Sequence, residues 1–180
     1  MITKIDRREN GWFLNADNSY QKNDLPLTHT IGYTVQGLIE CSQLIADKRL
    51  LLAAQKSLDA LLHQFERRKT LLAARFNSLW RPAAKSSCLV GDAQISIAWL
   101  MLYEIFGDPR YLNAALKMLD LLKSIQIKSS IKHLDGALMS SFPFWGEYHP
   151  YTINSWGTKY FADALMLEIK TKNILERRLS

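Results

Sequence analysis

Cysteine, glycine and proline are all scarce in this chain. Of its 180 residues, 2 are Cys, 8 are Gly and 5 are Pro. So few turn-forming residues exclude a fold of many short strands and favour helices. The two cysteines, Cys41 and Cys88, form neither a CxxC motif nor a Cys/His cluster at metal-ligand spacing. We therefore expect no metal site, and we expect both thiols to be buried and reduced.

Long apolar runs and cofactor motifs are missing as well. No apolar stretch approaches the ~20 residues that span a bilayer, and the polar start MITKIDRREN is unlike a signal peptide. The sequence has no GxGxxG or GxxxxGK[ST] loop, no HExxH and no GxSxG. These absences predict a cytoplasmic protein that contacts no membrane and uses no cofactor.

Positive charge is in excess but scattered. The formal charge is +6 at pH 7, and the densest groups are Arg67-Arg68-Lys69 and Arg177-Arg178. Solvated loops and helix ends explain such groups, and attraction to an anionic polymer such as an acidic glycan is the alternative. No known nucleic-acid-binding module is recognisable, so we expect no nucleic-acid partner.

Hydrophobic residues make up 48% of the chain, and they follow a repeated pattern. An apolar helix is predicted over residues 31–46 and again over 93–106, each followed by an amphipathic helix, over 49–66 and 109–122. A shift of 61 residues places Asp47 on Asp108 and Leu58-Asp59 on Leu119-Asp120 without a gap. Agreement at both core and surface positions indicates an internal repeat of helical hairpins.

A third copy of the unit begins at residues 136–139. It leads through SSFPFWGEYHPYTINSW to a last apolar helix, predicted over residues 152–168, and the tail 169–180 adds at most a partial outer helix. Short strand-like pieces precede the first two hairpins at 11–15 and 75–77. We therefore expect one all-α domain, residues 1–180, with repeats at about 11–66, 74–124 and 136–180.

The alternation of inner and outer helices, with GDPRYLNAALKMLDLL as turn and outer helix, resembles the (α/α) toroids. In particular it is similar to the six-hairpin glycosidase superfamily, which includes unsaturated glucuronyl hydrolases, polysaccharide lyases and sugar epimerases. The stretches CLVGDAQISIAWLMLYEIFGDPRYLNAALKMLD and FPFWGEYHPYTINSWGTKYFADALMLE look like uncharacterised bacterial proteins linked to polysaccharide biosynthesis. The resemblance implies an incomplete α/α toroid that covers about half of a six-hairpin ring.

On function, the resemblance implies a carbohydrate-active domain of hydrolase, lyase or epimerase type that acts on or binds a bacterial polysaccharide or its precursor. The alternatives are a non-catalytic helical-repeat module for a glycan or protein partner, and a truncated remnant of a toroid enzyme. An open half-ring would expose apolar flanks, which usually mark partner surfaces. We therefore expect a second copy or another chain to complete the ring.

In the resembled superfamily the site lies where the inner helices begin. The resemblance implies Asp92 and Glu147 as a catalytic acid/base pair. The implied saccharide-binding residues are His29, Trp80, Arg81, Trp145, Tyr148, His149 and Trp156. Aromatic faces stack on sugar rings while polar groups bind the hydroxyls, and a Tyr/His pair could instead abstract a proton beside a uronate carboxylate. Arg81 would hold such a carboxylate.

Several of these residues have a structural alternative. Asp92 follows Gly91 at a helix start, where a carboxylate often caps the helix. His29 stands between two threonines at another helix start and suits a hydrogen-bonded structural histidine equally well. The catalytic interpretation requires both carboxylates to face one open cleft within ~10 Å of each other.

Overall fold

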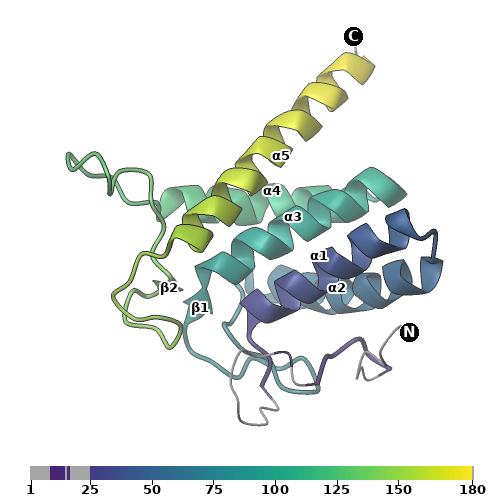
Figure 1. Cartoon of the computed structure of the whole chain (residues 1–180), viewed down its shortest axis with the longest axis horizontal. Coiled ribbons are helices and arrows are strands. Elements are labelled where there is room, and N and C mark those ends of the chain that lie inside the picture. The colour runs from purple at the N-terminus through teal and green to yellow at the C-terminus, as the bar shows by residue number, and fades with distance from the viewer. Residues whose placement is uncertain (1–8, 15, 17–24, 180) are drawn as a thin grey trace.

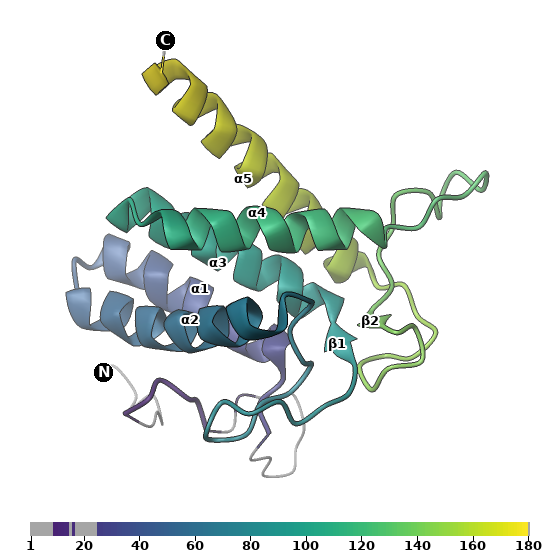
Figure 2. The ribbon, with the colours of Figure 1, turned by 180° about the vertical axis from the view of Figure 1, so that it is seen from behind.

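The computed structural model describes residues 9–14, 16 and 25–179 of the chain. The elements in order are α1 (Thr28–Leu44), α2 (Lys48–Arg68), β1 (Ser87–Cys88), α3 (Leu89–Phe106), α4 (Pro109–Ser124), β2 (Ser141–Phe142) and α5 (Ser155–Leu179). Helices α1, α3 and α5 form an inner layer in which α3 packs against both of the others (Figure 1). Seen from behind, α2 and α4 form the outer layer (Figure 2). The fold is an incomplete α/α toroid, as the sequence predicted.

The 61-residue repeat is visible in atomic detail at the start of each outer helix. Asp47 caps α2 by accepting a hydrogen bond from the Arg49 backbone nitrogen at 2.9 Å, and Asp108 caps α4 in the same way from Arg110 at 2.9 Å. In both turns the arginine Nη2 also pairs with the same carboxylate at 2.7 Å. The two outer helices therefore begin with the same capping geometry at positions 61 residues apart.

Helix α3 is the centre of the core because it is apolar on nearly every side. Its Trp99 is fully buried, and the indole Nε1 donates to the Leu58 carbonyl of α2 at 3.2 Å. By length and composition α3 is the one helix in the described part of the chain that could cross a membrane, yet 67% of it is buried inside the fold. Its apolarity is thus that of a core helix wrapped by its neighbours.

Two glycines let α1 and α3 approach closely at the end where both begin. A Cβ on Gly91 of α3 would lie 2.7 Å from the His29 backbone nitrogen, and one on Gly32 of α1 would lie 2.7 Å from the Gln94 Cβ. Any larger residue at either position would therefore push the two helices apart. This contact places His29 and Gln94 side by side.

The linkers between hairpins join the same ends of the inner helices. The first backbone nitrogen of α1, on Thr28, donates to the Ala74 carbonyl at 2.8 Å, and that of α3, on Leu89, donates to the Ser140 carbonyl at 3.1 Å. Strands β1 and β2 pair antiparallel, with Cys88 opposite Ser141. Helices α1 and α3 thus each begin on the linker of the following repeat, which gathers these loops at one end of the molecule (Figure 1).

Three sequence-based expectations are wrong in detail. The tail forms no outer helix: residues 169–179 contain no Asp to match the caps Asp47 and Asp108, and α5 continues without a break to Leu179. The expected strand at 11–15 is a single bridge at Phe13, and residues 75–77 form isolated bridges only. Cys41 is exposed on α1, whereas Cys88 is buried as predicted. The polar lead-in, residues 1–8, lies outside the described residues.

Candidate functional site

A cluster of aromatic rings surrounds His29 at the end where the inner helices begin. The His29 ring centroid lies 4.7 Å from that of Tyr33, 5.6 Å from that of Tyr148 and 6.5 Å from that of Tyr160. These residues come from α1, the β2–α5 loop and α5. The contacts between α1, the β2–α5 loop and α5 therefore form a compact aromatic and polar cluster.

One hydrogen bond and burial fix the protonation state of His29. Its Nδ1 lies 2.7 Å from the amide oxygen of Gln94, and both side chains are buried. Because an amide oxygen only accepts, Nδ1 carries the proton and Nε2 is left as an acceptor. Burial lowers the pKa of His29, the Gln94 contact opposes that shift in part, and His149 adds to it. His29 is therefore a neutral imidazole at pH 7, with a free acceptor nitrogen.

The β2–α5 loop adds a second hydrogen-bonded group to the cluster. The Trp156 indole Nε1 donates to the Tyr148 hydroxyl at 3.0 Å, and the His149 ring lies 4.6 Å from Tyr148 and 5.9 Å from Trp156 between centroids. Burial raises the pKa of Tyr148 to about 12. His149 also adopts a left-handed backbone with φ of 47°, a strained state that recurs at functional sites. The Tyr148 hydroxyl thus keeps its proton and can donate it.

Tyr33 and Tyr160 connect this cluster to a groove on the inner face. Their centroids are 5.5 Å apart, and burial together with the Tyr33 hydroxyl raises the pKa of Tyr160. The Gln94 amide nitrogen is fully enclosed and has no hydrogen-bond partner among the described residues. Tyr33 and Tyr160 both contact the His29 ring and both line the groove, so they connect the two.

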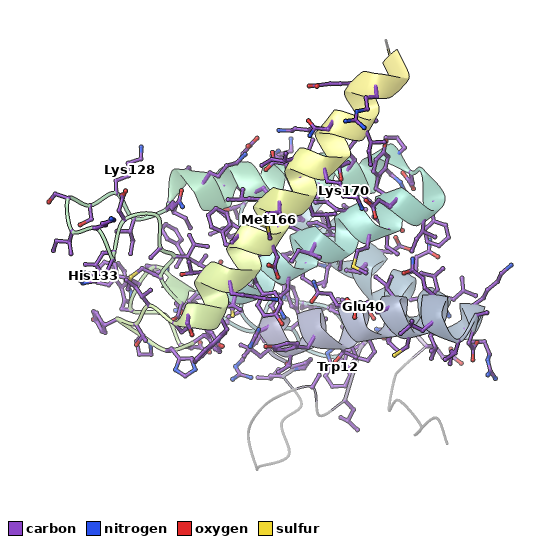
Figure 3. All side chains as sticks on the ribbon, turned by 45° about the horizontal axis from the view of Figure 1, so that its top comes forward. Trp12, Glu40, Lys128, His133, Met166 and Lys170 are labelled. Carbon is purple, nitrogen blue, oxygen red and sulfur yellow. The ribbon has the colours of Figure 1, made fainter. Side chains whose placement is uncertain are left out.

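We call this hollow the inner groove. It has a volume of about 430 Å³ and is lined by Tyr33, Gln36, Gly37, Glu40, Ile97, Lys159, Tyr160, Asp163 and Leu167. Helix α1 supplies one wall, α5 the other, and Ile97 of α3 lies between them. Glu40 stands on the α1 wall and Asp163 on the α5 wall, and Figure 3 shows Glu40 on this open side of the molecule. The groove thus presents carboxylates and tyrosine rings to a ligand.

Asp92 does not face an open cleft. It is fully buried in the first turn of α3, where its Oδ1 accepts a hydrogen bond from the Leu72 backbone nitrogen at 3.1 Å and its Oδ2 has no partner. Burial raises the pKa of this carboxyl well above its ordinary value, against the smaller effect of the Leu72 bond. Asp92 therefore holds the 71–74 linker against α3 as a neutral acid.

Glu147 lies apart from Asp92 in a different environment. Its side chain is 57% exposed, and its carboxylate lies 3.8 Å from the Arg75 Nε. With Trp145, Lys85 and Ser86 it lines a shallow hollow of about 250 Å³. Because Asp92 is enclosed and Glu147 faces solvent, the expected cleft with two opposed carboxylates is not formed.

Trp80 and Arg81 also lie away from the cluster. Trp80 is buried, its Nε1 donates to the Asn10 carbonyl at 3.0 Å, and its ring packs 5.8 Å from that of Phe76. Arg81 is exposed, and its backbone nitrogen donates to the Asn77 side chain at 3.0 Å. Of the predicted residues, the structure therefore brings together His29, Tyr148, His149 and Trp156.

The sequence reasoning missed the residues that connect the cluster to the inner groove. Tyr33 follows His29 by one helical turn, and Tyr160 follows Trp156 by one turn. Residues four apart on a helix share a face, so this spacing was a usable signal. Gln94, Glu40 and Asp163 carried no comparable signal, because their roles depend on which helices face each other.

Comparisons with known proteins support the fold. The chain is similar to a solved structure of an unsaturated glucuronyl hydrolase, whose title names the saccharide dGlcA-Glc-Rha-Glc, with a TM-score of 0.63 and 16% sequence identity. The match covers 89% of this chain, and this chain spans about half, 47%, of that one. No family model and no curated protein matches the sequence. At this identity the likeness shows a toroid glycosidase-like fold.

Proposed function

We propose that this chain is a saccharide-binding domain of a carbohydrate-active protein, with the inner groove and the His29 cluster as its site. The observation that carries the proposal is the continuity of the two through Tyr33 and Tyr160. Sugar rings stack on aromatic faces, and their hydroxyls pair with carboxylates, amides and imidazole. The toroid neighbour named together with an oligosaccharide supports this assignment.

The chemistry at the mouth of the groove favours proton transfer over a two-carboxylate hydrolysis. His29 offers a neutral acceptor nitrogen, and the Tyr148 hydroxyl offers a proton. Such a pair suits removal of a proton from one face of a carbon beside the carbonyl of a bound sugar, and return of a proton to the opposite face of that carbon. The enclosed carboxyl of Asp92 leaves a glycosidase-type pair without one member. We therefore propose an epimerase type of reaction as the candidate activity.

Two tryptophans from the same part of the chain provide a matched test. Trp156 belongs to the cluster and is 40% exposed, whereas Trp145 is 58% exposed and lines the separate hollow beside Lys85. We expect Trp156→Ala to weaken saccharide binding at least tenfold and Trp145→Ala to change it less than twofold. Burial of a large apolar side chain against a ligand contributes about 1.5–3 kcal/mol, and ~1.4 kcal/mol is a tenfold change in affinity. Calorimetric titration with an oligosaccharide panel measures both.

Circular dichroism of both variants checks that they are folded. Equal losses for Trp156→Ala and Trp145→Ala, or binding that neither substitution changes, would contradict a site at the inner groove. Incubation of each bound oligosaccharide, followed by proton NMR, shows whether a bond is broken or a stereocentre changes.

A further inference from the structure

We propose that the inner groove selects uncharged saccharides and discriminates against acidic ones, an inference that rests on the proposed function. The groove carries negative charge on both of its walls. Glu40 projects from α1 and Asp163 from α5, while Lys159 is the one cation among the described lining residues. A ligand in the groove therefore lies between two carboxylates, and a third carboxylate on that ligand would be repelled.

Lys159 does not compensate for both acids. Its Nζ lies 2.5 Å from the Asp163 Oδ2, one turn further along α5, and 4.3 Å from the centroid of the Tyr160 ring. A uronate carboxylate would have to displace Asp163 from this lysine. The formal charge of the lining is −1, from two acids and one base, although the whole chain carries +6. The excess positive charge of the molecule is thus not in the groove.

The remaining polar groups also suit hydroxyl donors. Next to Tyr33 and Tyr160 of the lining, the His29 Nε2 is an acceptor, and burial keeps that ring neutral by lowering its pKa. The Gln36 amide nitrogen donates to the backbone carbonyl of Gln94 at 3.4 Å, which leaves the Gln36 amide oxygen as an acceptor. Carboxylates, imidazole and amide oxygens all accept hydrogen bonds, and sugar hydroxyls donate them.

The basic residue expected to hold a uronate carboxylate lies elsewhere. Arg81 is exposed in the 77–82 turn and is not among the groove residues. Arg75 binds the Leu25 carbonyl at 2.7 Å and approaches Glu147. A carboxylate-binding site normally uses an arginine in two-point contact, and the described lining of the inner groove has none.

Matched pairs of sugars test this selectivity. The probes are gluco-, galacto- and manno-oligosaccharides, each compared with the same oligosaccharide whose terminal C6 hydroxymethyl group is oxidised to a carboxylate. We expect the acidic member to bind about three- to tenfold more weakly at low salt, from repulsion at ~4–6 Å in a partly hydrated site. The ratio of neutral to acidic affinity should decrease at 1 M salt, where the Debye length is ~3 Å.

Charge-removing variants locate the effect in the groove. Asp163→Asn and Glu40→Gln should each reduce the ratio of the affinity for the neutral oligosaccharide to the affinity for its acidic counterpart. Asp120→Asn, which removes a charge from the outer helix α4, should leave this affinity ratio unchanged. Equal or tighter binding of the acidic members, or a ratio unaffected by Asp163→Asn, would overturn the selectivity while the saccharide site stands. Failure of every pair to bind would overturn the saccharide site itself.

Discussion

At the scale of single residues, Asp92 is the group whose chemistry the fold alters most. It is fully buried, accepts one hydrogen bond from the Leu72 backbone nitrogen, and has its pKa raised by burial. Asp92→Asn keeps the accepting oxygen and should leave stability at pH 7 unchanged or higher. Asp92→Ala leaves the buried Leu72 N–H without a partner and should cost about 1–3 kcal/mol. Chemical denaturation measures both.

The same carboxyl predicts a pH dependence of known sign. In the unfolded chain Asp92 ionises near its ordinary value of 3.8, whereas in the folded protein it stays protonated to much higher pH. Above pH ~4 the folded state therefore binds more protons than the unfolded state, and this group's contribution to stability falls as pH rises. Asp92→Asn should remove that decline. An unchanged pH profile in Asp92→Asn would contradict a neutral Asp92.

At the scale of elements, Gly91 is one of the two glycines on which the close crossing of α1 and α3 depends. A Cβ at Gly91 would meet backbone atoms of His29 and Thr28 at 2.7–2.8 Å, whereas a Cβ at Gly37 would meet nothing within 4 Å. Gly91→Ala should therefore destabilise the fold by about 1–3 kcal/mol through overpacking. Gly37→Ala, in the same inner layer, should stabilise it by about 0.5–1 kcal/mol.

Thermal and chemical unfolding of the two alanine variants, measured side by side, checks this prediction. The opposite signs make it specific, because both substitutions add the same methyl group to a helix. Similar shifts for Gly91→Ala and Gly37→Ala would mean that the two helices do not approach as closely as described.

The helices were predictable because the sequence repeats. The matched pairs Asp47 with Asp108 and Leu58 with Leu119 gave the turns and the buried faces of both outer helices before any coordinates. The length of α5 was not predictable from that pattern, because the third unit has no counterpart of the turns capped by Asp47 and Asp108. The exposure of Cys41 was also missed, since an apolar helix of an inner layer keeps one side open where the ring is incomplete.

The convergence of the loops was predictable, but the side chains that they bring together were predictable only in part. The loops before the inner helices do converge, and they bring together His29, Tyr148, His149 and Trp156. Asp92 could not be distinguished from a solvent-facing acid, because one helical position does not show whether a linker will cover it. Gln94 was invisible for the same reason, since its role arises from the Gly91 contact between two helices.

At the scale of the whole molecule, the inner layer has an open side. Met166 and Ile169, three residues apart on α5, are 62% and 58% exposed, and Figure 3 shows Met166 on the outward side of that helix. The contact between α4 and α5 is polar: the buried Glu168 of α5 forms ion pairs with Lys123 of α4 at 3.3 Å and with Lys172 of α5 at 2.6 Å. Exposed apolar side chains next to each other favour a partner.

We therefore predict that a second copy covers this face in solution. Sedimentation at tens of micromolar should give a mass above the 20.7 kDa of one chain, and Met166→Lys should return it to that value. Leu79→Lys, at an exposed apolar position in a loop, controls for the added charge. A mass of one chain at every concentration would exclude the second copy and leave a different chain as the partner.

The two thiols differ in exposure, so that Cys41 can be labelled selectively. Burial raises the pKa of Cys88 to about 12, so that its thiolate is not formed in neutral solution, whereas Cys41 is exposed. Cys41 follows Gly37 by one turn of α1 and adjoins Glu40, both of which line the inner groove. A fluorophore attached by thiol chemistry to the wild-type chain would thus report directly on occupancy of the groove.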